Sequence, residues 1–256
     1  MKYIKLETID KTLIIYIDRV EKLNALNSTV IKELDEILTE YLNDDSVKCI
    51  VITGSGDKSF VAGADISEME NFTPLEATDY SNKGINLFNK IETYTKPIIA
   101  VIDGYALGGG CELAMACHIR YASEKSIFGL PEVTLGLIPG YGGTQRLRNL
   151  VGLGKACELI FSGKHIGSEE ALRIGLINKI CEDPIQDSLK LSNKISKNSP
   201  LAIKYAIQSI TSGLNSNYFD SFDIENNLFS NLFKAEDSKE GINAFLNKRS
   251  PDFKGK

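Results

Sequence analysis

A chain of 256 residues with 43% hydrophobic and 25% charged side chains has enough apolar material for a large buried core. Its net charge of −5 argues against the basic face that binds nucleic acid. The five cysteines lack the close spacing of zinc motifs, which indicates reduced thiols, and no apolar run has the length of a signal peptide or a membrane span. We therefore expect a cytoplasmic protein without a nucleic-acid or membrane partner.

The chain up to residue 183 alternates predicted strands with predicted helices. Short apolar runs predict strands, and apolar side chains three and four residues apart predict helices. Strands are predicted at residues 3–8, 13–17, 49–53, 98–102, 119–122 and 126–128. Helices are predicted at about residues 27–43 and 74–93, from Glu112 onward, and at about 143–150. This alternation is typical of an α/β core.

From residue 184 onward the pattern predicts helices alone. They are expected at residues 184–197, 200–214, 218–233 and 236–247. No low-complexity linker separates them from the preceding residues. We therefore divide the chain into an α/β core, residues 1–183, and a C-terminal helical region, residues 184–256, which packs on the core or on a neighbouring subunit.

Several familiar motifs are absent. The segment Gly152–Ala156 lacks the first glycine and the final Ser/Thr of a phosphate loop, and no dinucleotide fingerprint follows the first strand. Neither of the two histidines, His118 and His165, has a second ligand at helical spacing, so no metal site is expected. The Gly-x-Ser-x-Gly motif of a serine nucleophile is missing as well.

Three segments carry residues that suit chemistry. The first, Ala62–Asp65, follows a predicted buried strand, and its small side chains would let another molecule approach the main-chain amides. A tight loop without a ligand is the alternative interpretation.

The second segment is the glycine run Gly108-Gly109-Gly110 before the helix expected at Glu112. Each glycine costs a helix about 1 kcal/mol relative to alanine, and access to the backbone would explain that cost. The first amides of a helix lack internal partners and suit an oxyanion. Glu112 lies three residues after Gly109, hence on the same face, and leans toward the same opening. Close helix packing is the alternative.

The third segment, Phe128–Glu132, runs into the Gly- and Pro-rich residues 136–143. Pro131 stiffens the approach to Glu132, and the following glycines predict rigid turns before the next helix. Taken alone, a glutamate in a loop is most often solvated.

Together these segments resemble the crotonase (enoyl-CoA hydratase/isomerase) superfamily, and the resemblance runs nearly end to end. The matching segments are Asp18–Leu26, Phe60–Ile66, Gly108–Glu112, Pro131–Arg146 and Phe245–Pro251. The resemblance implies an α/β crotonase-like (ClpP/crotonase) spiral of repeated ββα units with a C-terminal helical region. The chain departs from the usual pattern at Val20, Leu130 and His118, where relatives commonly have proline, glutamine and aspartate.

The resemblance also implies the site residues. It places oxyanion-hole amides at Ala64 and Gly109 and the two catalytic carboxylates at Glu112 and Glu132. The substrate-binding residues that it implies are Lys22, Leu23, Ala62, Ala64, Asp65, Ile66, Ser67, Gly109 and Gly140.

The activity that the resemblance implies is the reversible hydration of a short-chain trans-2-enoyl-CoA, a hydro-lyase reaction. Coenzyme A would be part of the substrate, and no separate cofactor is implied. Having both glutamates favours a hydratase or dehydratase over an enoyl-CoA isomerase and over a non-catalytic relative that binds acyl-CoA or RNA. A homohexamer built as a dimer of trimers, acting in fatty acid or butyrate metabolism, is also implied. Acyl chain length and physiological direction stay open.

Overall fold

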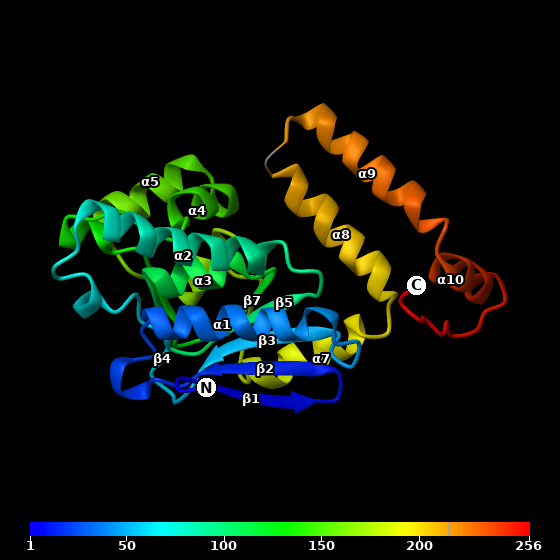
Figure 1. Ribbon diagram of the computed structural model, residues 1–256, viewed down its shortest axis with the longest axis horizontal. Helices are drawn as coiled ribbons and strands as arrows, with labels where there is room; N and C mark the ends of the chain where they lie inside the picture. Colours follow the sequence, from blue (N-terminus) through cyan, green and yellow to red (C-terminus); the bar gives the residue numbers. More distant parts are fainter. Residues whose placement is uncertain (215) are drawn as a thin grey trace.

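A computed structural model describes residues 1–214 and 216–256, and its larger sheet confirms the predicted α/β class. This sheet has the strand order β1-β2-β3-β5-β7-β10, in which only β1 and β2 pair antiparallel (Figure 1). Its strands are β1 (Ile4–Ile9), β2 (Thr12–Ile17), β3 (Cys49–Gly54), β5 (Ile98–Ile102), β7 (Ile119–Ser123) and β10 (Lys179–Cys181). The strands predicted at residues 3–8 and 13–17 are therefore present and form this antiparallel pair, and the predicted buried strands are present as well.

A second, smaller sheet is formed by short strands, most of which come next in the chain after a strand of the larger sheet. It has the order β4-β6-β8-β9. Its strands are β4 (Ser59–Val61), β6 (Tyr105–Leu107), β8 (Ile127–Gly129) and β9 (Ile166–Gly167). Because β4, β6 and β8 each come directly after β3, β5 and β7, the repeated strand–strand–helix unit expected from the resemblance is formed. These short strands were mostly missed by sequence reasoning, since two or three residues show no alternation.

Helices cover the sheets, and local sequence explains where several of them begin. The helices are α1 (Ser28–Glu40), α2 (Pro74–Glu92), α3 (Gly109–Ala116), α4 (Gly143–Val151), α5 (Leu153–Ser162), α6 (Ser168–Arg173), α7 (Pro184–Ile195), α8 (Pro200–Gly213), α9 (Tyr218–Leu232) and α10 (Glu236–Leu246). Asn27 caps α1 by accepting a hydrogen bond from the Val30 amide, and Thr73 with Glu76 forms a capping box on α2. Sequence reasoning did not predict α5 and α6.

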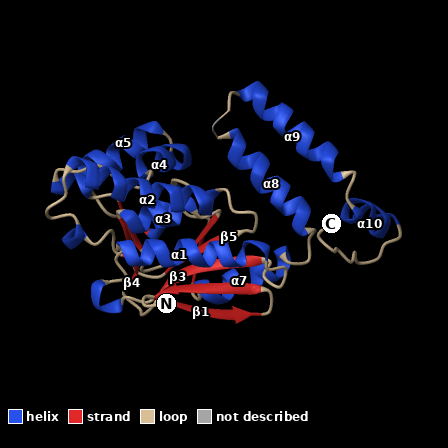
Figure 2. Cartoon of the chain, in the orientation of Figure 1, coloured by secondary structure: helices blue, strands red, loops and turns tan. Residues whose placement is uncertain are grey.

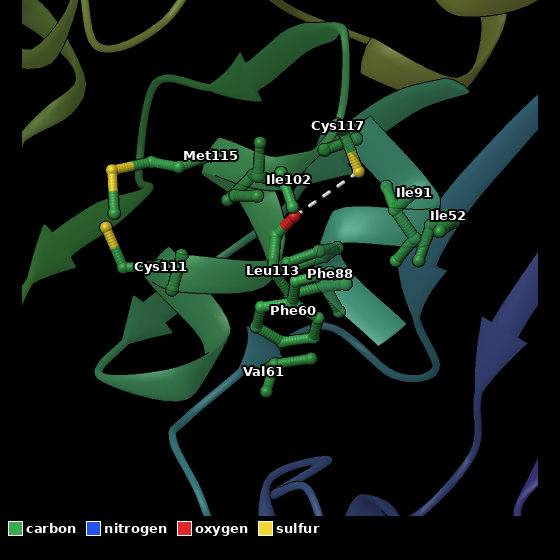
Figure 3. Close-up of a cluster of buried hydrophobic side chains, with 14 of the residues drawn as sticks. Ile52, Phe60, Val61, Phe88, Ile91, Ile102, Cys111, Leu113, Met115 and Cys117 are labelled. Carbon is green, nitrogen blue, oxygen red and sulfur yellow. Dashed lines mark hydrogen bonds between the residues drawn. The ribbon is translucent and has the colours of Figure 1, made fainter. Parts of the chain in front are cut away.

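Helix α3 lies in the centre of the core and corrects one expectation. It begins at Gly109, not at Glu112, and all its residues are buried. Figure 3 shows Leu113 beside Phe60 and Phe88, which come from β4 and α2. A Cβ added to Gly110 would lie 2.0 Å from the Val61 carbonyl oxygen. Close packing therefore explains this glycine, and burial offsets its weak helix propensity.

Among the C-terminal helices, α7 packs on the larger sheet, whereas α8 and α9 pack mainly on each other. Helix α7 packs on the large sheet, where Leu189 joins a cluster with Ile14 and Val51. Helices α8 and α9 pair with each other and extend away from the sheets, with α10 beyond them (Figures 1 and 2). None of the described side chains of α9 is buried. The division into residues 1–183 and 184–256 stays a prediction.

Within residues 1–214 and 216–256, none of the helices combines the length and apolarity needed to cross a membrane.

Candidate active site

The segment Gly63–Asp65 is held against Leu26 by a single parallel bridge. The Leu26 amide donates to the Gly63 carbonyl at 2.8 Å, and the Asp65 amide donates to the Leu26 carbonyl at 2.7 Å. Successive residues of an extended chain point their N–H groups to opposite sides. The Ala64 N–H therefore points away from Leu26.

The Gly109 amide lies beside the Ala64 amide. Gly109 is the first residue of α3, where an N–H has no acceptor inside the helix. A Cβ added to Gly109 would lie 3.4 Å from the Ala64 nitrogen. The structure thus brings together the two amides that the resemblance assigns to an oxyanion hole, and their role in catalysis stays a prediction.

Glu112 is buried in α3, with 1% of its surface exposed. Its Oε1 accepts hydrogen bonds from the Tyr141 amide at 2.8 Å and the Gly143 amide at 2.7 Å. A Cβ added to Gly143 would lie 2.8 Å from both Cγ and Oε1 of Glu112, so glycine is needed there. Gly143 is the first residue of α4, whose N-terminus favours a carboxylate. With Oε1 engaged in this way, Oε2 is the oxygen left for a reactant.

The pKa of Glu112 reflects opposing influences. Burial and, after it, the negative charge of Glu132 raise this pKa to about 7. The amides of Gly143 and Tyr141 and the charge of Arg146 oppose the rise. Glu132 therefore lies close enough for its negative charge to act on Glu112. A carboxyl that titrates near neutral pH suits proton transfer.

Glu132 begins the 3₁₀ turn η4 (Glu132–Leu135) and is less enclosed by partners. Its Oε2 is buried without a hydrogen-bond partner among the described residues, and burial raises its pKa. A Cβ added to Gly108 would lie 2.8 Å from Oε1 of Glu132, and Gly108 has a φ of +47°. Only glycine satisfies both conditions. An unpaired buried carboxyl oxygen is the kind of group that a ligand or water completes.

Lys22 and Leu23 lie next to the segment that carries Ala62. The Leu23 carbonyl accepts hydrogen bonds from the Ala62 amide at 3.0 Å and from Ser59 Oγ at 2.9 Å. Both Lys22, in η1 (Val20–Lys22), and Leu23 are exposed. The structure therefore brings these predicted substrate-binding residues to one edge of the site.

Asp65 has partners within the chain. Its carboxylate accepts hydrogen bonds from Ser67 Oγ at 2.6 Å and from Arg19 at 2.6 Å. Ser67 first, and Arg19 next, lower its pKa. These contacts hold the loop that carries Ala64. Next to Asp65, the side chain of Ile66 in η3 (Ile66–Glu68) is 49% exposed, so it can meet a ligand.

Gly140 belongs to the Gly- and Pro-rich residues 136–143, which follow Glu132 in the sequence. Its carbonyl accepts a hydrogen bond from Ser81 Oγ of α2 at 2.5 Å. A Cβ added to Gly140 would meet no heavy atom within 4 Å, so the space beside it is open.

Sequence reasoning missed the amides of Tyr141 and Gly143 as partners of Glu112. Part of the signal was available, because Gly142-Gly143 stands at the start of the helix predicted at about 143–150, much as Gly108-Gly109 stands shortly before the helix expected at Glu112. The sequence contains no sign that the N-terminus of α4 binds the side chain of Glu112, which belongs to α3.

A groove of about 1450 Å³ lies elsewhere, along the turns that follow β3, β5 and β7. Gly54, Asp103 and Ser123 are among the residues that line it, and neither Glu112 nor Glu132 does. Lys125, which forms an ion pair with Asp103, also lines the groove. The carboxyls and amides described above form a separate site.

Comparison with known proteins shows what the chain as a whole is similar to. The family model described as enoyl-CoA hydratase/isomerase matches residues 8–256. The chain is 45% identical to the short-chain-enoyl-CoA hydratase of Clostridium acetobutylicum, over 95% of this chain and 94% of the relative. It is 42% identical to the crotonyl-CoA hydratase of Syntrophomonas wolfei, over 97% of this chain and 96% of the relative. A crystal structure of an enoyl-CoA hydratase from Bacillus anthracis superposes with a TM-score of 0.95 at 33% identity, covering 99% of this chain and 100% of that one.

Proposed function

The chain belongs to the enoyl-CoA hydratase/isomerase family, and from this premise we propose that it is a hydro-lyase that reversibly adds water to a short-chain trans-2-enoyl-CoA. The names of its relatives favour crotonyl-CoA as substrate and 3-hydroxybutyryl-CoA as product. Coenzyme A is then part of the substrate, and the proposed reaction needs no further cofactor, because the thioester itself accepts the electrons.

One observation carries the proposal: two amides and two carboxyls from three separate segments lie at one place. The Ala64 and Gly109 amides lie side by side, and the negative charge of Glu132 raises the pKa of the buried Glu112. A conjugated thioester needs both kinds of group at once, one for its oxygen and one for its protons.

The amides would act on the thioester oxygen. Attack of water on Cβ moves negative charge onto this oxygen, and donors aimed at it stabilise the transition state more than the ground state. The Ala64 and Gly109 amides are fixed by the bridge to Leu26 and by the start of α3, so they need not reorganise during the reaction.

The carboxyls would divide the proton transfers. In hydration, Oε2 of Glu112 takes a proton from the attacking water, and Glu132 delivers a proton to Cα. These roles reverse in dehydration. The amides on Oε1 of Glu112 favour its anion, and burial of the unpaired Glu132 favours its acid form, which supports this assignment.

The test is an assay with the purified chain. Crotonyl-CoA should lose its conjugated absorbance, and mass spectrometry should find 3-hydroxybutyryl-CoA. A shift of the double bond without uptake of water would identify an isomerase instead. Binding of crotonyl-CoA with no change in it would identify a non-catalytic binding protein.

The proposal includes a homohexamer made of two trimers, in the cytoplasm. The exposed apolar side chains of α9, of α10 and of the residues between them support self-association, since large apolar surface seldom stays in water. They include Phe229, Phe233, Phe245 and Leu246. Sedimentation should give six times the chain mass of 28.2 kDa. A monomer would overturn this part of the proposal.

A further inference from the structure

Arg146 of α4 is a buried cation that the proposed chemistry does not use. Its side chain is 8% exposed. Nη1 donates to the Tyr141 carbonyl at 2.9 Å, and Nη2 donates to Asn89 Oδ1 at 2.7 Å and to Glu92 Oε2 at 3.0 Å. Nε donates to the same Glu92 oxygen at 3.2 Å. One guanidinium thus joins the residue that binds Glu112 to the last turn of α2.

The last turn of α2 is itself fixed to the core. The Glu92 carbonyl accepts a hydrogen bond from His118 Nε2 at 3.1 Å, and His118 Nδ1 accepts one from the Ile98 amide at 2.9 Å. Since Nδ1 accepts, the proton of the neutral ring is on Nε2. Burial lowers the pKa of His118 to about 4, so this link between α2 and β5 persists at neutral pH.

The Tyr141 ring is held by the same helix. A Cβ added to Gly84 would lie 2.2 Å from the Tyr141 ring, and the Phe88 ring lies edge-on to it with centroids 5.4 Å apart. With its ring packed on α2 and its carbonyl bound by Arg146, Tyr141 has little freedom to turn its N–H away from Glu112.

The turn between Tyr141 and Gly143 also fits closely around the guanidinium. Gly142 has a φ of +93°, and a Cβ there would lie 2.5 Å from Nη1 of Arg146. The main chain can therefore pass next to this cation only because the residue is glycine.

We propose that Arg146 is a positioning residue for Glu112. By holding the Tyr141 carbonyl against α2, it aims the amides of Tyr141 and Gly143 at Oε1 of Glu112 and so directs Oε2 toward the water. This inference rests on the proposed function, because it assigns Glu112 the role of base.

The pKa of Glu112 can test the proposal, because it depends on the charges of neighbouring side chains. Glu132, from η4, raises the pKa of Glu112, and Arg146, from α4, lowers it. Burial raises the pKa of the Cys111 thiol to about 12 and raises that of the Tyr141 phenol, so both neighbours are neutral near pH 7. Removing the charge of Arg146 should therefore raise the pKa of Glu112.

The experiment compares Arg146→Met, Arg146→Lys and Glu92→Gln in crotonyl-CoA hydration across pH. In Arg146→Met we expect kcat to fall by about 10- to 100-fold with little change in KM, as for a misplaced catalytic group. The acid limb of the pH–rate profile should move up by about 1 pH unit, because the ionised base is lost at a higher pH as pH falls.

The other two variants separate charge from geometry. Arg146→Lys keeps the positive charge, so its acid limb should stay at the wild-type pH, but its kcat should remain below that of the wild type, since lysine lacks the planar fork. Glu92→Gln leaves Arg146 without its counter-charge and should move the limb down.

Lys96→Met is the matched control. Lys96 is a half-buried cation that also binds main-chain carbonyls, those of Tyr41 and Asp44. It should lower the melting temperature and leave the acid limb in place. The proposal would be overturned if the acid limb of the Lys96→Met profile shifted as that of Arg146→Met does. It would also be overturned if the acid limb stayed at the wild-type pH in Arg146→Met, Arg146→Lys and Glu92→Gln alike.

A second measurement does not depend on turnover. Infrared titration of the protonated carboxyl band that disappears in Glu112→Gln reports the pKa of Glu112 directly. Opposite shifts in Arg146→Met and Glu92→Gln would support the inference even if crotonyl-CoA proved not to be the substrate. A band that titrates identically in wild type and both variants would refute it, whatever the activity.

Discussion

Glu112 and Glu132 lie in regions of opposite character. Glu112 is enclosed in α3 and accepts two amide hydrogen bonds on one oxygen, whereas Glu132 sits in a 3₁₀ turn with a buried oxygen that has no partner. Amide donors fix a carboxylate in place and favour its charged form, and burial without donors favours the acid. In the proposed mechanism, this difference in neighbouring main-chain groups is what would make one glutamate the base and the other the acid.

The starts of α3 and α4 differ in a parallel way. The first amide of α3, that of Gly109, lies beside the Ala64 amide and is left for a ligand, whereas the first amide of α4, that of Gly143, binds Glu112. Two helix N-termini thus lie at the candidate site: that of α4 binds the Glu112 carboxylate, and that of α3 is the one that the proposed mechanism assigns to the thioester oxygen.

The largest effect is expected when either carboxylate is removed. Glu112→Gln and Glu132→Gln should each lower kcat for crotonyl-CoA hydration by about 10²–10⁴, the range of acid–base groups. Glutamine keeps an oxygen for the amides of Tyr141 and Gly143, so the fold should stay intact by circular dichroism. A near-normal rate in either variant would remove that residue from the mechanism.

A smaller effect is expected from Gly143→Ala, which leaves both carboxyls present. The added methyl group would lie 2.8 Å from Glu112 and must displace its carboxylate, so we expect kcat to fall by about 10- to 100-fold. Gly154→Ala, in the first turn of α5, is the control, since its Cβ would meet nothing within 4 Å. Equal rates in the two variants would mean that the position of Glu112 does not limit the reaction.

The mildest test changes only pH. With the pKa of Glu112 raised to about 7, hydration should slow by about tenfold for each pH unit below that value, because the base becomes protonated. In Glu132→Gln the neighbouring negative charge is gone, so the acid limb of the residual activity should move to lower pH. A limb that stays in place would show that the two carboxyls do not interact.

Much of the fold follows from local sequence. The strands β2, β3 and β5 are continuous apolar runs, and α1 and α2 begin at polar caps, so spacing and composition predict them. The start of α3 is different, since glycine propensity argues against a helix at Gly109 and Gly110, and the close packing of Gly110 on Val61 of β4 offsets it. The strands of the small sheet exist because their neighbours pair with them.

The candidate site likewise has a part that local sequence predicts and a part that depends on contacts between distant residues. Sequence alone placed Glu112 on the face of Gly109, because three residues make nearly one helical turn. It did not predict that Tyr141 binds Glu112, a contact between residues 29 positions apart, or that Arg146 holds Tyr141 against Glu92, 54 positions away.

Sequence by itself determined the α/β class, most of the longer helices and strands, and the three segments that carry the amides and the carboxyls. Tertiary structure alone decided which oxygen of Glu112 is engaged, why Gly108 and Gly143 must be glycine, and how Arg146 and Asp65 brace the site. The physical reason is distance along the chain: propensity and periodicity act over a few residues, whereas hydrogen-bond partners and buried charges are chosen by whichever segments the packed core brings together.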